Sequence, residues 1–232
     1  MAKRLAITGG ASGIGAAIGT AARAMGWETS LADHMPVAGC TALDVTDAAA
    51  VADWIAGLTD LQGLVCSAGI SAATPLLDTP PETFRRILDV NVTGCFLAAQ
   101  AAARAMVAGG KGGAIVLVAS VSGLRGVQGR VAYGASKAAV INMAQVMAMD
   151  LAPHGIRVNA ICPAPIETPM VTALHDAATR AQWTSRIPAA RYGRVEEVAE
   201  AALFLLDSAR SSYITGHALP VDGGYAGAGV MA

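Results

Sequence analysis

Aromatic and charged residues are scarce in this sequence, and neither sign of charge prevails. Of the 232 residues, 4% are aromatic, 14% are charged and 54% are hydrophobic, and the formal net charge is −1. So much hydrophobic sequence excludes an intrinsically disordered chain. A net charge near zero argues against nucleic acid or an anionic membrane as a partner. We therefore expect a folded protein with a large core.

Long apolar runs are also missing. No run reaches the roughly 18 residues needed to cross a bilayer without meeting a glycine or a charge. The first apolar stretch that is typical of a strand begins at Arg4, which leaves no room for a signal peptide before it. These absences predict a cytoplasmic protein with no membrane partner.

Cysteine and histidine are too sparse and too scattered to form a metal site. The four cysteines are Cys40, Cys66, Cys95 and Cys162. None of them has the close spacing that metal ligands show. We expect buried free thiols and no bound metal.

A glycine-rich turn near the N-terminus is the first positive signal. The apolar run Arg4–Thr8 is followed by Gly9-Gly-Ala-Ser-Gly13-Ile-Gly15 and then by an alanine-rich segment typical of a helix. In such an arrangement the free N–H groups and the positive end of the helix favour a bound anion. The glycines permit the tight turn and a close approach of backbone to ligand. The pattern predicts a site for a diphosphate.

A second signal is the pair Tyr133 and Lys137. A Tyr at position i and a Lys at i+4 share one face of a helix, and the surrounding sequence, free of proline until Pro153, favours a helix. A phenol has a pKa of about 10 and is a poor base at neutral pH, but a nearby cation favours the phenolate. The pair is therefore a candidate general acid/base for an alcohol or carbonyl group.

Further motifs follow along the whole chain. They are Asn91-Val-Thr-Gly94, Val158-Asn-Ala-Ile-Cys-Pro163, Thr168-Pro-Met170, Arg194-Val-Glu-Glu-Val198, Ile214-Thr-Gly216 and Val221-Asp-Gly-Gly224. With Thr8–Gly15 read as T-G-x-x-x-G-x-G, the chain resembles the short-chain dehydrogenase/reductase family from end to end. The resemblance implies hydride transfer between NAD(H) and a secondary alcohol or ketone, and a homotetramer.

The resemblance also implies an active-site quartet of Asn91, Ser120, Tyr133 and Lys137. Tyr133 would exchange a proton with the substrate oxygen, and Ser120 would hold that oxygen by a hydrogen bond. Lys137 would support Tyr133 and bind the nicotinamide ribose. Asn91 would bend its helix and fix a water that links Lys137 to solvent.

Cofactor contacts are implied in the same way. They are Gly9, Ser12, Ile14, Asp33, Asp44, Val45, Ala68, Gly69, Tyr133, Lys137, Pro163, Ile166 and Thr168. Asp33 ends the run Glu28–Asp33, which is typical of a second strand, about 20 residues beyond the glycine turn, where a carboxylate binds the adenosine ribose of NAD. A 2′-phosphate beside it would be repelled, so we expect NAD rather than NADP. Asp44 has a second interpretation, as the cap of the following helix.

The chain alternates short apolar strands with helices throughout. We expect strands at 4–8, 27–32, 40–44, 61–66, 113–119, 156–162 and 217–221, and helices at 14–26, 47–57, 81–108, 131–152 and 195–207. This order predicts an α/β fold, a Rossmann-type doubly wound parallel sheet of seven strands with helices on both faces, in a single domain over 1–232. The sites are expected at the carboxyl ends of the strands.

Three features depart from the family pattern. Too few residues separate Asp33 from Asp44 for a helix as well as a strand, so we expect a loop there and a more open adenosine pocket. Ser67 stands where the family usually has Asn, and Ala164 where it usually has Gly. None of these changes touches the groups that transfer the proton.

The substrate is the least determined part. A lid is expected at about 166–190, with Met170, Leu174 and Trp183 as apolar lining, opposite Ser122, Leu124, Val127 and Gln128. The nearby cations Arg125 and Arg130 are expected to form surface ion pairs. Alternatives to an alcohol dehydrogenase or ketone reductase are a cyclic-alcohol or dihydrodiol dehydrogenase, a 3-oxoacyl reductase and a non-catalytic dinucleotide-sensing protein.

Overall fold

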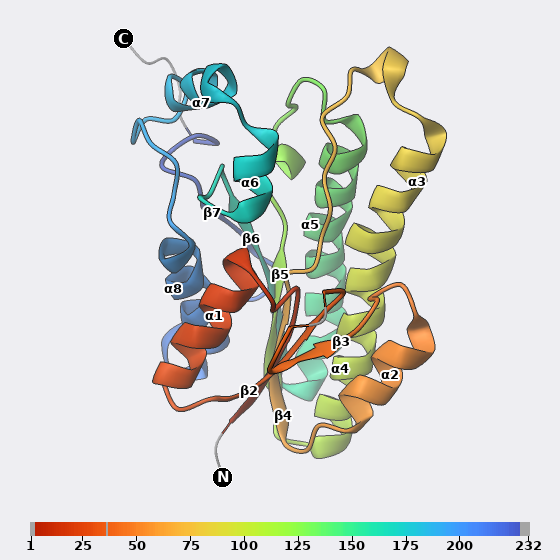
Figure 1. The fold of residues 1–232 in the computed structure, drawn as a ribbon. Helices are drawn as coiled ribbons and strands as arrows, with labels where there is room; N and C mark the ends of the chain where they lie inside the picture. Colours follow the sequence, from red (N-terminus) through yellow and green to blue (C-terminus); the bar gives the residue numbers. More distant parts are fainter. Residues whose placement is uncertain (1–2, 36, 228–232) are drawn as a thin grey trace.

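The computed structural model describes residues 3–35 and 37–227, and within them seven parallel strands form one sheet (Figure 1). The strand order is β3-β2-β1-β4-β5-β6-β7. The strands are β1 (Arg4–Thr8), β2 (Glu28–Asp33), β3 (Cys40–Ala42), β4 (Leu61–Cys66), β5 (Gly113–Val118), β6 (Ile156–Pro163) and β7 (Ala218–Val221). The predicted doubly wound sheet is confirmed. The predicted domain also takes in residues 1–2, 36 and 228–232, which lie outside the described residues.

Helices cover both faces of the sheet (Figure 1). The main ones are α1 (Gly13–Ala24), α2 (Ala48–Ala56), α3 (Pro81–Leu88), α4 (Cys95–Gly109), α5 (Val131–Leu151) and α8 (Val195–Leu206). Helices α1 and α8 pack together on one face, while α2, α4 and α5 lie on the other. Short helices α6 (Pro169–Leu174), α7 (Ala177–Thr184) and α9 (Ser208–Ser211) complete the set of α-helices in the described ranges.

The apolar character of the strands follows from this double covering. Within β1, Leu5 and Ile7 join the core under α1 and α8, whereas Ala6 between them joins the core under α2, α4 and α5. Successive side chains of a strand point to opposite faces, so a strand covered on both faces is apolar at nearly every position. Because all the strand pairs are parallel, the carboxyl ends of the strands lie at one edge of the sheet.

The helix predicted at 81–108 is interrupted. Its middle turn, Asp89–Gly94, is a π-helical segment that separates α3 from α4. The whole stretch Pro81–Gly109 is long and apolar enough, by length and composition, to span a membrane. Because α4 packs against α2, β4 and β5, the stretch occupies the position of a core helix in an α/β fold.

The short second crossover is a loop, as predicted. In the described part of the segment between Asp33 and Cys40 no helix is present, and β3 is only three residues long. Beyond it, Asp47 rather than Asp44 caps α2, because its carboxylate accepts the N–H groups of Ala49 and Ala50. The cap interpretation of Asp44 is therefore wrong.

Candidate active site

The glycine turn after β1 fits closely against the loop after β4. A Cβ built on Gly9, where φ is +70°, would lie 2.6 Å from the backbone N of Ala68, and one on Gly15 would lie 2.1 Å from the carbonyl O of Gly9. Ser12 precedes α1 without a side-chain capping bond, and no acidic residue stands in the first turn. The first N–H groups of α1 therefore face the cavity without a side-chain partner, as in an anion site.

Asp33 lies beside this turn at the carboxyl end of β2. One carboxylate oxygen accepts the N–H of Ala11 at 3.1 Å and the other accepts the N–H of Met35 at 3.0 Å. The carboxylate thus lines the cavity in a fixed orientation next to the turn.

Asp44 and Arg86 form the outer wall of the same end of the cavity. Asp44 accepts hydrogen bonds from the backbone N and the hydroxyl of Thr46, at 2.9 and 2.7 Å, and these bonds lower its carboxyl pKa. The guanidinium of Arg86 lies 3.9 Å from Asp44. Sequence reasoning missed Arg86, because it comes from α3, remote in sequence from the glycine turn.

At the other end of the cavity, Ser120, Tyr133 and Lys137 line one wall. The Oγ of Ser120 accepts the N–H of Ser122 at 3.1 Å, which leaves its own O–H free to donate. The Nζ of Lys137 donates to the carbonyl of Val118 at 2.8 Å and lies 5.6 Å from the centroid of the Tyr133 ring. The end of β5 and the first turns of α5 therefore hold these three groups together.

Asn91 lies behind that wall, buried in the π-helical segment. Its Oδ1 accepts the N–H of Ile70 at 2.8 Å, while Nδ2 donates to the carbonyl of Ile70 and to the Oγ of Ser136, both at 3.0 Å. The side chain thus clamps the loop after β4 to α5. The helix irregularity at Asn91 is as predicted, and the water relay stays a prediction.

The contact between the Ser120 loop and α5 gives a direct test of this geometry. A Cβ on Gly123 would lie 2.6 Å from the backbone C of Lys137 and 2.8 Å from the N of Ala138. We expect Gly123→Ala to cost about 1–3 kcal/mol of stability and to lower turnover, because α5 must move away from Ser120. Gly126→Ala is the control, since nothing lies within 4 Å of its Cβ. Equal thermal melting and activity of the two variants would contradict this packing.

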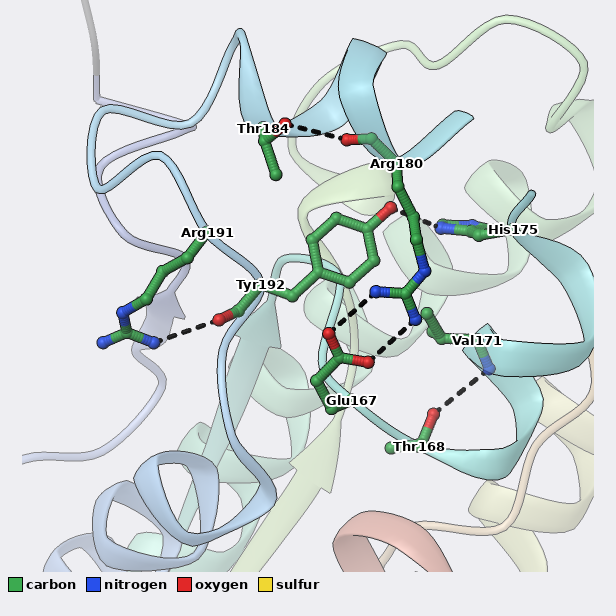
Figure 2. Close-up of polar contacts among 8 residues, drawn as sticks. All are labelled: Glu167, Thr168, Val171, His175, Arg180, Thr184, Arg191 and Tyr192. Atoms are coloured by element: carbon green, nitrogen blue, oxygen red, sulfur yellow. Dashed lines mark hydrogen bonds and ion pairs between the residues drawn. The ribbon is translucent and has the colours of Figure 1, made fainter. Parts of the chain in front are cut away.

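Helices α6 and α7 lie above the carboxyl ends of the strands (Figure 1), and residues of both line the cavity. Figure 2 shows how buried Tyr192 anchors them: its hydroxyl meets Nδ1 of His175 at 2.9 Å, and the Arg180 guanidinium lies 4.7 Å from the centre of its ring. Arg180 in turn donates to both oxygens of Glu167, at 2.8 and 2.9 Å, which lowers the carboxyl pKa of Glu167. Trp183 of α7 stacks on His175 with ring centroids 6.3 Å apart.

All the residues predicted for the cofactor line one cavity of about 430 Å³. Of the predicted substrate residues, Ser122, Met170, Leu174 and Trp183 line it as well. Gln128 does not: it is exposed on the loop before α5, and Leu124 and Val127 are also outside the lining. The prediction for Gln128 is therefore wrong, because the loop turns its tip to solvent before α5 begins.

Arg130 corrects a second expectation. Instead of a surface ion pair, its guanidinium is half-buried in the cavity wall, where Nη1 donates to the Oγ of Ser71 at 2.6 Å and Nη2 meets Nε2 of His175 at 3.1 Å. Arg130 is the N-cap residue of α5, three residues before Tyr133, so both side chains come from the same end of that helix. Arg125 donates to the carbonyl of Ala226 at 2.8 Å.

The cysteines agree with the sequence analysis, with one difference. All four cysteines are free, and Cys66, Cys95 and Cys162 are buried, but Cys40 on the edge strand β3 is only partly covered. Burial raises the pKa of the Cys162 thiol to about 11. Within the described ranges no group of three or more potential metal ligands is found.

Comparison with known proteins adds independent information. The family model described as "Enoyl-(Acyl carrier protein) reductase" matches residues 9–226. The 2-(S)-hydroxypropyl-CoM dehydrogenase 3 of Xanthobacter autotrophicus is 38% identical, with 95% of each chain covered. A short-chain type dehydrogenase/reductase from Mycobacterium marinum superposes with a TM-score of 0.89 at 40% identity, over 96% of this chain and 95% of that one.

A further solved structure shows a ligand in a chain of the same fold. It is a gluconate 5-dehydrogenase from Burkholderia cenocepacia J2315 in complex with NADP and tartrate. Its TM-score is 0.91 at 32% identity, with 97% of this chain and 96% of that chain covered.

Proposed function

Because the chain belongs to the short-chain dehydrogenase/reductase family, we propose that it transfers a hydride between NAD(H) and a secondary alcohol or ketone, with Tyr133 as general acid/base. The family uses nicotinamide dinucleotide cofactors, and relatives such as the 2-(S)-hydroxypropyl-CoM dehydrogenase act on alcohols. The observation that carries the proposal is one cavity lined by Ser120, Tyr133 and Lys137 at one end and by the glycine turn at the other.

The residues of this cavity fit a dinucleotide. The uncapped N-terminus of α1 suits the diphosphate and Asp33 suits the adenosine ribose. Gly9 lets the turn lie directly against the loop after β4, where a side chain would meet the backbone of Ala68. On the nicotinamide side, Lys137 has used one of its three N–H donors on Val118 and keeps the others for a ribose hydroxyl. When bound, the nicotinamide supplies or accepts the hydride.

The proton is handled by side chains of this chain. In oxidation, the Tyr133 phenolate takes the hydroxyl proton of the alcohol; in reduction, the phenol returns it to the carbonyl oxygen. Ser120 donates its free O–H to the same oxygen, which steadies the charge that develops there. Asn91 keeps α5 and the loop after β4 in place, so that these groups stay within reach of one substrate atom.

We also propose that α6 and α7 form the substrate lid, within the predicted 166–190. Met170, Leu174 and Trp183 contribute its apolar inner surface, with Ser122 opposite. A lid of this kind excludes water and completes the site around the substrate. The cytoplasm is the compartment that fits an enzyme of small molecules whose thiols are all free.

A panel of secondary alcohols and ketones tests the function. Absorbance of the reduced nicotinamide is followed with NAD and with NADP, and the panel includes a cyclic alcohol, a dihydrodiol and a 3-oxoacyl thioester. We expect turnover of at least one alcohol or ketone. Tight binding of the dinucleotide with no turnover of any panel member would instead support the sensing protein.

Assembly as a homotetramer is a further proposal. The outer sides of α4 and α5 carry exposed apolar side chains, among them Phe96, Val146 and Met149. Helices with apolar residues on more than one side are normally buried on both, and two-fold contacts would cover them. Light scattering at micromolar concentration should give about four times the chain mass of 23.3 kDa. A monomeric mass would refute the tetramer.

A further inference from the structure

Arg130 places a positive charge in the substrate end of the cavity. Its guanidinium lines the wall together with Tyr133, Ser71 and His175, and its Cζ lies 5.8 Å from the centroid of the Tyr133 ring. Arg130 stands at the start of α5, one turn before Tyr133. A group bound to this guanidinium would therefore belong to the same molecule whose oxygen meets Tyr133.

This charge has only neutral partners. In the part of the chain that the structure describes, ion pairs are formed by six other cationic residues and none includes Arg130. Its hydrogen-bond partners are the Ser71 hydroxyl and the His175 ring. Taking a cation out of water costs free energy unless a counter-charge replaces the lost hydration. Burial accordingly lowers the pKa of Arg130.

The neighbouring His175 does not supply the missing charge. Because Arg130 donates to its Nε2, the proton of the neutral ring is assigned to Nδ1, which faces the hydroxyl of Tyr192. Burial, and next the charges of Arg130 and Arg180, lower the pKa of His175 and keep it neutral. His175 and Ser71 thus act as positioning residues that hold the guanidinium still.

Arg180 on the lid shows the contrast. It makes a two-pronged ion pair with Glu167 on the partly exposed side of the lid, so its charge is satisfied inside the protein. Arg130, on the cavity side, keeps three of its five N–H donors beyond the two bonds to Ser71 and His175. Those donors suit an acid group, because a planar guanidinium binds carboxylate, sulfonate and phosphate oxygens.

Resting on the proposed function, we propose that Arg130 binds an acid group of the substrate, so that the enzyme oxidises short secondary alcohols bearing a carboxylate, sulfonate or phosphate, or reduces the matching ketones. The acid group supplies the counter-charge that the protein lacks at this position. It also fixes which way round the substrate lies, because the guanidinium and Tyr133 then hold two points of one small molecule.

Paired substrates test the proposal. For each short secondary hydroxy acid, kcat/KM is compared with that of its neutral analogue, for example 3-hydroxybutanoate with 3-hydroxybutanamide, and a sulfonate and a phosphate of similar length replace the carboxylate in two further arms. We expect the unmodified protein to prefer one acid class over its neutral analogue at least about tenfold, in line with a hydrogen bond to a charged group. The substrate class with the highest ratio to its neutral analogue identifies the acid group that Arg130 binds.

Variants at two arginines separate binding from structure. Arg130→Gln should bring the acid-to-neutral ratio of kcat/KM close to one, mainly through KM, and Arg130→Lys should keep part of it. Arg125→Gln is the matched control: it removes the same charge from the same loop, outside the cavity, and should leave the ratio unchanged. Binding of the unreactive short acid butanoate to the cofactor-loaded protein, followed by calorimetry, should weaken about tenfold or more in Arg130→Gln only.

The outcomes are distinguishable. If no alcohol or ketone is turned over, the proposed function fails. The inference about Arg130 fails, and the proposed function stands, if kcat/KM for neutral alcohols equals kcat/KM for their acid analogues. The inference also fails if Arg130→Gln lowers kcat/KM for acid and neutral substrates alike and Arg130→Lys restores neither. Thermal melting of each variant shows whether the lid and the fold are retained.

Discussion

Replacing Tyr133 by Phe is expected to lower kcat by roughly 10²–10⁴, the usual loss when a general acid/base is removed. The substitution deletes one oxygen and leaves the ring, whose neighbours Lys137 and Arg130 lie 5.6 and 5.8 Å from its centroid. Packing should therefore change little. Fluorescence titration of the reduced cofactor should show nearly unchanged binding, and the thermal melting temperature should stay within a few degrees.

The loss of kcat is expected to be large because Tyr133 meets both requirements of a general acid/base in this cavity. Its hydroxyl carries a transferable proton, and the two nearby cations favour negative charge on its oxygen in the transition state. Ser120 has a free O–H but no neighbouring base, and it stays in place in the variant. Tyr213→Phe is the control, since Tyr213 is fully exposed. Near-normal turnover of Tyr133→Phe would exclude the proposed mechanism.

The sheet and the glycine turn could be predicted from the sequence because their signals are local. Strands buried on both faces are short apolar runs, and the turn after β1 needs glycine where its backbone touches Ala68 and Gly9. The pair of Tyr133 and Lys137 is likewise fixed by helix periodicity. For these elements, neighbours in sequence are also neighbours in space.

The π-helical turn is a feature that periodicity alone does not predict, although the family resemblance implied a bend at Asn91. The segment from Asp89 to Gly94 has no glycine or proline that would break a helix before Gly94, so the pattern favoured one continuous helix. The irregularity is instead accompanied by a tertiary contact, in which the amide of Asn91 pairs with both backbone groups of Ile70. Contacts of this kind are not visible in periodicity.

Gln128 and Arg130 illustrate the same limit at the substrate end. Both precede Tyr133 on one short segment, and the polar amide was predicted to face the substrate while the cation was assigned to the surface. The structure reverses them, because Arg130 is the N-cap residue of α5 and lines the cavity, whereas Gln128 lies on the exposed loop before it. Where the helix begins decides which side chain enters the cavity.

The segment proposed as a lid could be located in the sequence, but the contacts that hold it in place could not. A gap between β6 and α8 indicated a covering segment, whereas the contacts that hold it join residues from three stretches: His175 after α6, Arg180 in α7 and Tyr192 before α8 (Figure 2). Each of these is unremarkable in the sequence alone. They become informative only once the fold brings them around one buried ring.

The proposed preference for NAD over NADP rests on Asp33. In the structure its carboxylate is held by the N–H groups of Ala11 and Met35, so it cannot easily turn away from a ligand beside the turn. A 2′-phosphate a few ångströms away would be repelled by about 1–4 kcal/mol at effective dielectric constants of 80 to 20. Arg86, a cation that lines the same end of the cavity, already faces Asp44 at 3.9 Å. Solved relatives include an NADP complex, so the preference needs a measurement of its own.

We expect kcat/KM with NAD to exceed that with NADP in the unmodified protein, and Asp33→Ala to narrow the ratio by roughly tenfold or more, since 1.4 kcal/mol corresponds to a factor of ten. Two effects act together: NAD loses the acceptor for its ribose hydroxyls, and the repulsion of the 2′-phosphate disappears. Asp53→Ala is the control, because that carboxylate is exposed on α2, lies outside the cavity lining and should affect both cofactors alike. Equal or better activity of the unmodified protein with NADP would overturn the assignment, and a ratio that moves equally in both variants would show that Asp33 does not set it.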